Sequence, residues 1–420
     1  MFKLNGKVPD EFDFFQGNDV FDLVKAYGSP LYVYNEGIIR ERCRELKNLV
    51  SYPKFLAQYS AKANTSLAFL QIVKSEGLHV DAMSPGEIYA ELEAGFEPSD
   101  IFMITNNVSE SEMQFAIDKG ILVCVDCLEQ LETYGKLNNG GKVAIRFNGG
   151  IGAGHHEKVV TAGKKTKFGV NPEYIPQVKE ILKKYNLKLV GVQQHIGSLF
   201  MEIDPYIEGS RAILDIAKNF DDLEFVDFGG GFGIPYKKLS GQPRLNLKEC
   251  GEKLDKVFES FVKEYGKEIT FRIEPGRYIS AESSVLLTDV HCVKYNGPHK
   301  FAGTDVGFNV LVRPAMYDSH HDIEVYAKEA RPVNEEEITI VGNICESGDI
   351  IAKDRLLPEI KAGDILGILD AGAYGHSMCS NYNNRLRPAE VFIRENGEVV
   401  LTRKRDTLEQ LLENYVKLDI

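Results

Sequence analysis

The stretch KFLAQYSAKANTSLAFLQIVKSEGLHVDAM, residues 54–83, decides the fold because it contains two short β-type runs separated by one helical pattern. The runs cover residues 54–60 and 79–83, and the amphipathic segment 66–77 between them ends at Gly77. Apolar residues at helical spacing before a glycine are typical of a helix and its C-cap. The stretch therefore predicts a β–α–β unit, in which a helix joins two parallel strands.

The same alternation continues along the chain until eight β-type runs have passed. The runs are residues 54–60, 79–83, 101–105, 122–126, 142–148, 188–196, 223–228 and 269–274. Eight strands that alternate with helices are typical of a (β/α)8 barrel, so we expect an α/β fold with such a barrel over residues 37–280. The alternative is a doubly wound open sheet, which the count of eight disfavours.

The pattern changes after Gly276, where helical segments become rare. Strand-like runs then occupy residues 282–295, 300–306, 337–346, 365–372 and 389–403. The last of them contains Asn396-Gly397, a hairpin turn signal. We therefore expect a mostly antiparallel β domain formed by residues 1–36 and 281–420. A helical pattern returns only in residues 406–416.

The amino-acid composition excludes some kinds of binding partner for this protein. Lys and Arg total 49 against 62 Asp and Glu, which gives a net charge of −13. A surface this acidic repels phosphate backbones, so we expect no nucleic-acid partner. The sequence has no run apolar enough for a membrane, no signal-peptide core, and only seven cysteines, too few for a disulfide scaffold. We therefore expect a cytoplasmic protein with reduced thiols and no membrane contact.

Polar residues follow the predicted barrel strands, at the rim where (β/α)8 enzymes place their chemistry. Lys62 follows the first run, Asp81 lies in the second, and His195 and Glu274 end the sixth and eighth. A lysine desolvated at a strand end has a nucleophilic amine, which suits a Schiff base with an aldehyde cofactor. A lone lysine in a loop is more often a surface residue. The apolar run before Lys62 and the polar rim favour the functional interpretation.

Three further rim features fit an aromatic cofactor that carries a phosphate. GGGFG, residues 229–233, follows the seventh run, and consecutive glycines can turn backbone N–H groups toward an anion. A carboxylate at Glu274 could keep a ring nitrogen protonated, and His195 could stack on the ring. Each feature also has an ordinary explanation: a tight glycine turn, an ion pair between Glu274 and Arg277, and a hydrogen-bonded core histidine.

The predicted β domain carries three more clusters. RPAMY, residues 313–317, offers a guanidinium that could bind a carboxylate. Cys345-Glu346 pairs a thiol with a carboxylate, which suits a proton donor, although a structural thiol is the commoner role of a single cysteine. DAGAY, residues 370–374, places a phenol in a glycine-rich turn.

Metal binding is not expected. The adjacent pairs His155-His156 and His320-His321 point apart and complete no cluster of four ligands. Cys124 and Cys127 have redox spacing, but no second cysteine pair accompanies them.

Seven motifs in order resemble the fold-type III pyridoxal-phosphate decarboxylases, and their spacing is most similar to that of the diaminopimelate decarboxylases. The motifs are YSAKAN (59–64), HIGS (195–198), GGGFG (229–233), EPGR (274–277), RPAMYDSHH (313–321), CESGD (345–349) and DAGAYG (370–375). The resemblance covers nearly the whole chain. It implies an alanine-racemase-like barrel, pyridoxal 5'-phosphate as cofactor, and a small-molecule amino-acid substrate. The resemblance to this subgroup further implies that the substrate is meso-2,6-diaminopimelate, which would lose CO2 to give L-lysine in the last step of lysine biosynthesis.

The resemblance also implies a role for each matching residue. The catalytic residues are Lys62, which carries the cofactor, Cys345, which donates a proton, and His195, which lies against the ring. The cofactor-binding residues are Lys62, Asp81, His195, Ser198, Gly229, Gly230, Gly231, Glu274, Gly276, Arg277 and Tyr374. The substrate-binding residues are Arg277, Arg313, Tyr317, Glu346 and Tyr374.

In this family the CESGD segment comes from the neighbouring subunit, which implies a homodimer with shared active sites. Residues 149–169 match an active-site loop. Three alternatives stay open: a decarboxylase of another basic amino acid such as D-lysine, D-ornithine or carboxynorspermidine, an amino-acid racemase, and an inactive relative that binds a protein partner. Lys62 and Cys345 together favour an active decarboxylase.

Overall fold

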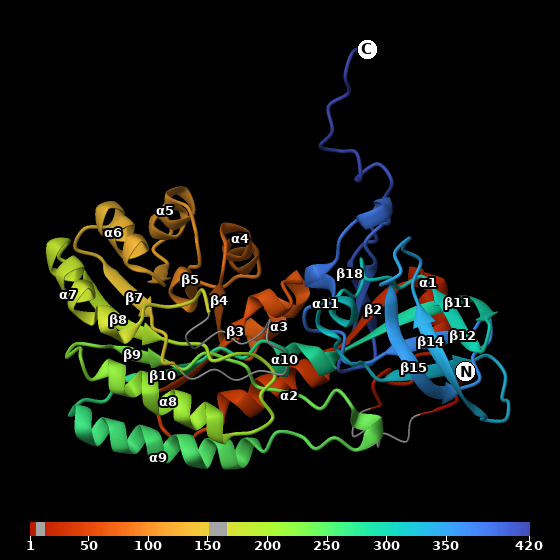
Figure 1. Ribbon diagram of the computed structural model, residues 1–420, viewed down its shortest axis with the longest axis horizontal. Helices are drawn as coiled ribbons and strands as arrows, with labels where there is room; N and C mark the ends of the chain where they lie inside the picture. The colour runs from red at the N-terminus through yellow and green to blue at the C-terminus, as the bar shows by residue number, and fades with distance from the viewer. Residues whose placement is uncertain (6–12, 151–165) are drawn as a thin grey trace. The chain divides into compact units, whose positions relative to one another are not determined.

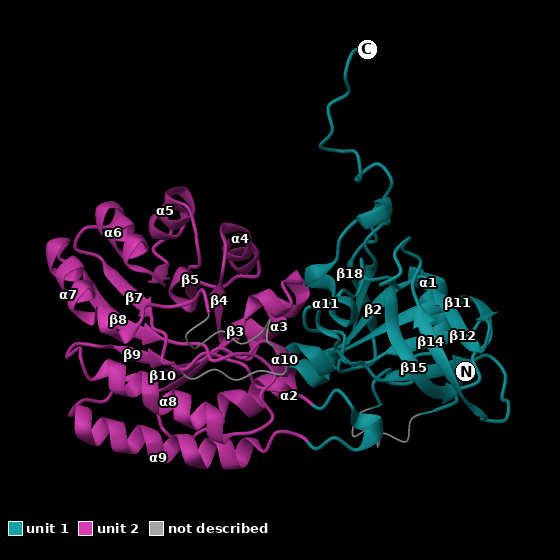
Figure 2. Ribbon diagram, viewed as in Figure 1, with its two compact units in different colours: residues 1–39, 235–243, 280–420 teal, residues 40–234, 244–279 magenta. Residues whose placement is uncertain are grey.

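The computed structural model describes residues 1–5, 13–150 and 166–420 of the chain (Figure 1). The chain divides into two compact units (Figure 2). Unit 1 contains residues 1–39, 235–243 and 280–420, and unit 2 contains residues 40–234 and 244–279. The backbone therefore passes from one unit to the other four times, and neither unit is a contiguous segment of sequence.

Unit 2 is built on a closed barrel of eight parallel strands, which confirms the predicted fold (Figure 1). The strands are β3 (Phe55–Ser60), β4 (His79–Ala82), β5 (Ile101–Ile104), β6 (Leu122–Val125), β7 (Lys142–Arg146), β8 (Lys188–Gln193), β9 (Phe225–Asp227) and β10 (Thr270–Ile273). Pairing of β10 with β3 closes the ring. The helices between the strands are α3 (Leu67–Ser75), α4 (Pro85–Glu93), α5 (Glu110–Asp118), α6 (Leu128–Leu137), α7 (Ile175–Lys184), α8 (Asp204–Ala217) and α9 (Leu247–Tyr265). Two helices flank the barrel in sequence, α2 (Glu36–Lys47) and α10 (Arg277–Ser280).

Local signals explain where several of these helices begin and end. The Ser84 side chain caps α4 by accepting a hydrogen bond from the Glu87 backbone N–H. Ser109 and Glu112 form a reciprocal capping box at the start of α5. Gly266 ends α9 in the left-handed conformation, with φ of 75°.

Side chains fill the barrel interior, so the barrel is a core rather than a channel. The cluster consists of Phe102, Ile104, Cys124, Ala144, Val190 and Phe225. Phe102 and Phe225 come from strands that are not neighbours, and their ring centroids lie 5.5 Å apart in an edge-to-face arrangement. Ligands can therefore reach the barrel only at its ends.

Unit 1 is a ten-stranded, mostly antiparallel sheet, as predicted. Its strands are β1 (Phe2–Lys3), β2 (Leu31–Asn35), β11 (Ser284–Asn296), β12 (His299–Thr304), β13 (Ile323–Ala327), β14 (Glu335–Val341), β15 (Ile350–Pro358), β16 (Ile365–Ile368), β17 (Ala389–Ile393) and β18 (Val399–Arg403). Two helices accompany them, α1 (Val20–Tyr27) and α11 (Arg313–Tyr317). The two parallel pairings are β12 with β14 and β2 with β17.

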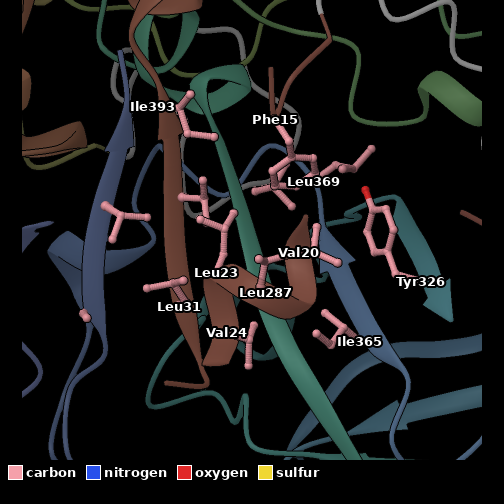
Figure 3. Close-up of a cluster of buried hydrophobic side chains, with 14 residues drawn as sticks. Phe15, Val20, Leu23, Val24, Leu31, Leu287, Tyr326, Ile365, Leu369 and Ile393 are labelled. Carbon is pink, nitrogen blue, oxygen red and sulfur yellow. The ribbon is translucent and has the colours of Figure 1, made fainter. Parts of the chain in front are cut away.

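Strand β2 occupies the middle of this sheet. It pairs with β11 on one side and with β17 on the other, and all five of its residues are buried. Its Leu31 and Val33 belong to a hydrophobic cluster that also takes Val20, Leu23 and Val24 from α1 (Figure 3). This cluster holds α1 against the sheet.

Two segments differ from the sequence-based expectations. Residues 406–416 have a helical pattern, but residues 408–414 form only turns, and Leu412 is 62% exposed. A short helix with no surface to bury its apolar face is marginal in water. Residues 235–243 lie inside the expected barrel range yet belong to unit 1. Lys238 explains the placement, because its Nζ contacts Asp370 Oδ1 at 2.5 Å and Glu282 Oε1 at 2.7 Å.

Among the helices that the structure describes, none combines the length and apolar character that crossing a membrane requires. Of the predicted active-site loop 149–169, residues 151–165 lie outside the described residues, and so do His155 and His156.

Candidate active site

Lys62 follows β3 directly, in a short 3-10 turn over Ala61–Ala63. The turn is fixed on both sides: the Ser60 N–H donates to the Pro275 carbonyl at 3.1 Å, and the Tyr59 hydroxyl donates to the Asn64 carbonyl at 3.1 Å. The Lys62 side chain is half-buried. The carboxyl end of β3 therefore presents an amine at the barrel rim.

Asp81 on β4 is fully buried, and its carboxyl interacts electrostatically with the Lys62 amine. Burial raises the pKa of the Asp81 carboxyl to about 7, Lys62 opposes this shift, and Glu87 adds to it. A second buried carboxyl, Glu91 on α4, lies near enough to interact with Asp81. Neither Glu91 oxygen has a hydrogen-bond partner in the described part of the chain.

Glu274 follows β10 and is 5% exposed. Its Oε2 accepts a hydrogen bond from Gln193 Nε2 at 2.9 Å, whereas its Oε1 is buried without a partner among the described residues. Burial, together with Asp227 and Asp81, holds the pKa of Glu274 well above its usual range, and Lys62 opposes that shift. The site therefore contains one carboxyl oxygen, Glu274 Oε1, that could accept a hydrogen bond from a ligand.

His195 follows β8, and its ring is neutral. Burial lowers the pKa of the imidazole well below its usual value, and the charges of Lys62 and Arg146 lower it further. The Gly230 N–H donates to His195 Nδ1 at 3.2 Å. Because Nδ1 accepts, the proton of the neutral ring resides on Nε2.

The segment Gly229–Gly231 passes between two other strand ends, so closely that side chains do not fit. A Cβ added at Gly230 would collide with the Glu274 carbonyl, and one added at Gly231 would collide with the Gly197 carbonyl. Gly231 also has a φ of 106°, which residues with side chains rarely adopt. These glycines keep side chains out of this part of the rim, while the Gly229 N–H donates to Asp227 Oδ1 at 2.9 Å and the Gly230 N–H donates to His195 Nδ1.

Arg277 and Ser198 complete the rim of unit 2. Arg277 Nη2 donates to Ser198 Oγ at 2.9 Å, and the guanidinium is 6% exposed. Gly276 packs on the Lys62 turn, where an added Cβ would approach the Ser60 and Ala63 side chains closely. The structure thus brings together all the predicted cofactor-binding residues of the barrel: Lys62, Asp81, His195, Ser198, Gly229, Gly230, Gly231, Glu274, Gly276 and Arg277.

Arg313 of unit 1 lies at the start of α11 and is 1% exposed. Its guanidinium lies over the Tyr236 ring at 4.6 Å from the centroid and contacts the side chains of His321 and Ser319. Tyr317, at the end of α11, is half-buried. Tyr374 is also half-buried, in a turn where its φ is 55°.

Cys345 and Glu346 are both exposed and form a separate cluster of unit 1. The Tyr382 hydroxyl donates to Glu346 Oε1 at 2.6 Å, and the Cys345 N–H donates to Asn383 Oδ1 at 3.1 Å. Phe308 stacks on Tyr382 with ring centroids 5.6 Å apart. Residues 380–385 therefore hold the Cys345-Glu346 loop in place.

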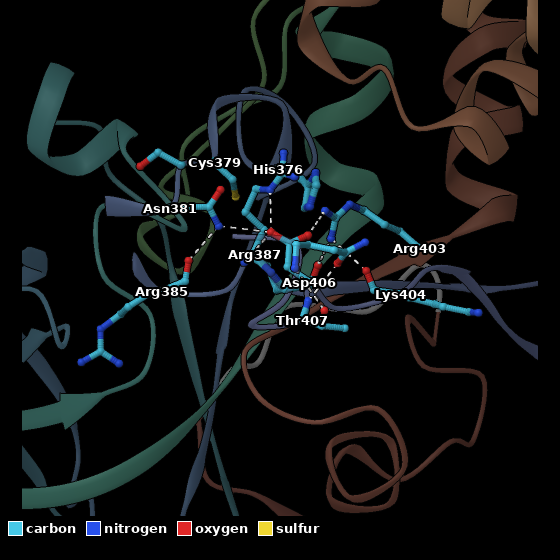
Figure 4. Close-up of polar contacts among 12 residues, drawn as sticks. His376, Cys379, Asn381, Arg385, Arg387, Arg403, Lys404, Asp406 and Thr407 are labelled. Carbon is cyan, nitrogen blue, oxygen red and sulfur yellow. Dashed lines mark hydrogen bonds and ion pairs between the residues drawn. The ribbon is translucent and has the colours of Figure 1, made fainter. Parts of the chain in front are cut away.

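Residues 380–385 are in turn anchored by Asp406 (Figure 4). Asp406 accepts hydrogen bonds from Arg387 Nε at 2.8 Å, Arg403 Nη2 at 2.5 Å and Asn381 Nδ2 at 3.1 Å. These donors keep the pKa of Asp406 below its usual range in spite of partial burial. The anchor connects the end of β18 to the segment that holds Cys345.

Sequence reasoning missed several residues of this arrangement, among them Gln193, His321, Tyr382 and Asn383. Gln193 stands two positions before His195, the first residue of the HIGS motif, and could have been found as a polar residue in a buried strand. His321 ends the RPAMYDSHH motif and belongs to an adjacent histidine pair, but neither pattern assigns it a role beside Arg313. Tyr382 and Asn383 lie in an Asn-rich run, which signals a turn and nothing more.

Within the described residues no group of three or more His, Cys, Asp and Glu side chains could hold a metal ion. All seven cysteines are free thiols, including Cys124 and Cys127.

The rim fits the cofactor that the family resemblance implies. The buried Oε1 of Glu274 can accept a hydrogen bond from a protonated ring nitrogen. The Gly229–Gly231 segment brings backbone without side chains to the rim, and the Lys62 amine lies within electrostatic range of Asp81 and Glu274.

Comparisons with known proteins agree with this geometry. Residues 36–281 match the pyridoxal-binding domain of the pyridoxal-dependent decarboxylases. The chain is 43% identical over 407 residues to the diaminopimelate decarboxylase of Methanothermobacter thermautotrophicus, covering 94% of each chain. It is 32% identical over 404 residues to that of Escherichia coli K12, covering 93% of this chain and 94% of the relative.

A solved diaminopimelate decarboxylase from Helicobacter pylori, complexed with L-lysine, superposes with a TM-score of 0.86 at 31% identity, covering 94% of this chain and 98% of the other. Sequence, fold and rim geometry therefore agree, and the chain belongs to the diaminopimelate decarboxylases, within the pyridoxal-dependent decarboxylase family.

Proposed function

We propose that the protein decarboxylates meso-2,6-diaminopimelate to L-lysine and CO2 with pyridoxal 5'-phosphate, the last step of lysine biosynthesis. The observation that carries the proposal is that Lys62, at the end of β3, interacts electrostatically with the buried carboxyls of Asp81 and Glu274. When bound there, pyridoxal phosphate supplies an electron-accepting ring for the electron pair left by CO2.

The barrel residues hold the cofactor in this proposal. The Lys62 amine binds its carbonyl carbon, and Glu274 Oε1 bonds its ring nitrogen. His195 is neutral, so it covers a ring face without adding a positive charge. The backbone of Gly229–Gly231, with Ser198, Gly276 and Arg277, binds the phosphate.

The residues of unit 1 bind the substrate and supply the proton. Arg313 pairs with the distal carboxylate, assisted by Tyr317 and by Arg277 of the barrel, and Glu346 pairs with the distal amine. Tyr374 lies beside cofactor and substrate. The Cys345 thiol donates a proton to the carbon that has lost CO2.

The active form is a homodimer in which each subunit lends Cys345 and Glu346 to its neighbour. Both residues are exposed in the single chain, and a hydrogen-bonded loop holds them there, which suits a segment presented to a partner. We place the enzyme in the cytoplasm, where seven free thiols stay reduced.

Release of CO2 from a panel of amino acids tests the proposal. The panel is meso-diaminopimelate, D-lysine, D-ornithine and L-ornithine, with D-lysine as the matched substrate that lacks only the distal carboxylate. Loss of a buried ion pair costs about 2–5 kcal/mol, so kcat/KM for D-lysine should be at least about 30-fold lower. Comparable turnover of D-lysine, or none of meso-diaminopimelate, would refute the proposal. Formation of D-lysine from L-lysine would indicate a racemase instead.

A further inference from the structure

His321 is the nearest polar neighbour of the Arg313 guanidinium. The His321 side chain is 1% exposed, and so is that of Arg313. Their closest atoms, His321 Nε2 and Arg313 Nη1, are 2.7 Å apart. The other ring nitrogen, Nδ1, lies 2.7 Å from the carbonyl oxygen of Leu369. Both nitrogens of the buried ring therefore contact groups whose hydrogen-bonding role is fixed, either as donor or as acceptor.

These two contacts determine the protonation of the ring. A guanidinium has donors only, so Nε2 must accept from Arg313. A carbonyl oxygen has lone pairs only, so Nδ1 must donate to Leu369. His321 is therefore the neutral tautomer with its proton on Nδ1, and a doubly protonated ring would lose the bond to Arg313.

Two further contacts also orient the guanidinium, and neither of them is with a carboxylate. Arg313 Nη2 donates to Ser319 Oγ at 3.2 Å, and the guanidinium lies over the Tyr236 ring. Tyr236 meets the His321 ring edge-to-face, with centroids 5.4 Å apart. None of these three partners carries a negative charge, so the positive charge of Arg313 is not cancelled by them.

His321 also links Arg313 to the turn that carries Tyr374. Its partner Leu369 precedes that turn, and the Leu369 N–H donates to the Asp322 carbonyl at 2.9 Å. The adjacent Asp370 has a φ of 58° and contacts Lys238. The imidazole thus joins α11 to the end of β16 through side-chain and backbone hydrogen bonds.

We propose that His321 is a positioning residue for substrate recognition: its neutral Nε2 fixes the Arg313 guanidinium in the orientation that binds the distal carboxylate. The inference rests on the proposed function, since it assigns that carboxylate to Arg313. It makes no claim that His321 touches the substrate. It predicts that affinity for the distal carboxylate, and nothing else in the reaction, depends on an acceptor at this position.

Binding of two ligands to the holoenzyme separates this role from a general structural one. L-lysine carries the distal carboxylate, and 1,5-diaminopentane is the same chain without it. Each dissociation constant is measured from the change in the visible spectrum of the bound cofactor. His321→Leu removes both ring nitrogens at similar volume, and His321→Gln restores an oxygen that can accept from Arg313.

In His321→Leu we expect the Kd of L-lysine to rise about 10-fold or more, because a buried donor is left unsatisfied. The Kd of 1,5-diaminopentane should stay within about twofold. His321→Gln should recover most of the L-lysine affinity, and KM for meso-diaminopimelate should follow the same order with a smaller change in kcat. If His321→Leu does not fold, His321→Met is compared with His321→Gln in the same way.

Equal weakening of both ligands, or unchanged L-lysine affinity in the variants without an acceptor, would overturn the proposal. The same holds if His321→Gln binds L-lysine as poorly as His321→Leu. Failure of the proposed function gives a different result, since the wild-type enzyme would then release no CO2 from meso-diaminopimelate.

Discussion

Glu91 is predicted to destabilise the barrel at neutral pH, and Glu91→Gln to stabilise it. Both Glu91 oxygens are buried without partners among the described residues, and the side chain is fully buried. Burial, with the charges of Asp81 and Glu87, raises its pKa from 4.5 to about 9. Glutamine has nearly the same shape and does not ionise, so the comparison isolates the cost of the charge.

The sign and size of the effect follow from the pKa in the two states. The folded carboxyl stays protonated up to a pH of about 9, while in the unfolded chain it ionises above 4.5. Its contribution to stability is therefore fully present below pH 4.5 and is lost as the pH rises toward 9. At about 1.4 kcal/mol per pH unit, Glu91→Gln should gain at most about 2 kcal/mol at pH 6 and about 5 kcal/mol at pH 8.5.

Calorimetric unfolding at the two pH values measures this difference, and it suits a chain without tryptophan. The additional 3 kcal/mol or so at pH 8.5 corresponds to a rise in Tm of about 6–12 °C for a unit of this size. Glu93→Gln is the matched control, because Glu93 is an exposed residue of the same helix. An equal gain at pH 6 and pH 8.5, or an equal response of the control, would refute the reasoning.

Three further predictions concern the proposed site. Lys62→Ala should abolish the visible absorbance of bound pyridoxal phosphate and reduce turnover by orders of magnitude; an unchanged spectrum with normal turnover would exclude Lys62 as the attachment point. Lys62→Ala and Cys345→Ala homodimers should each be nearly inactive, yet random subunit exchange should restore about a quarter of wild-type activity, because half the dimers then contain one intact site. If mass spectrometry shows exchange and no activity returns, Cys345 does not act across subunits. Gly230→Ala should weaken cofactor binding and lower the Tm, because the new methyl group collides with the Glu274 carbonyl; equilibrium dialysis and calorimetry that match the wild type would contradict this.

The barrel could be predicted because its signals are local. The first four βα units each carry an apolar run and a helical period within about thirty residues, and the stretch 54–83 shows both together with a glycine C-cap. The rim residues could be predicted because each lies at or just after the end of a strand, and parallel strands place their carboxyl ends at the same edge. Lys62, Asp81 and Glu274 came together on this rule alone.

The features that escaped prediction depend on contacts between distant segments. The contact between Lys238 and Asp370, which draws residues 235–243 into unit 1, leaves no periodic signal in the sequence. In the sequence, Glu91 resembles any polar residue on the solvent face of an amphipathic helix. Only the folded structure shows that its side chain is buried. Residues 406–416 show the opposite case, a helical pattern with no apolar surface to pack on.

The position of β2 in the sheet of unit 1 has a consequence for the folding of the chain while the ribosome is still making it. The strand is made early, but its partners β11 and β17 begin only at Ser284 and Ala389. At ~5–20 residues per second, roughly 20–70 s separate translation of β2 from that of β17. During this interval an apolar strand has both edges unpaired on the nascent chain, and unpaired strand edges can pair with strands of other chains. Substitutions in β2 or β17 should therefore lower the yield of folded protein without changing the kinetics of the molecules that do fold.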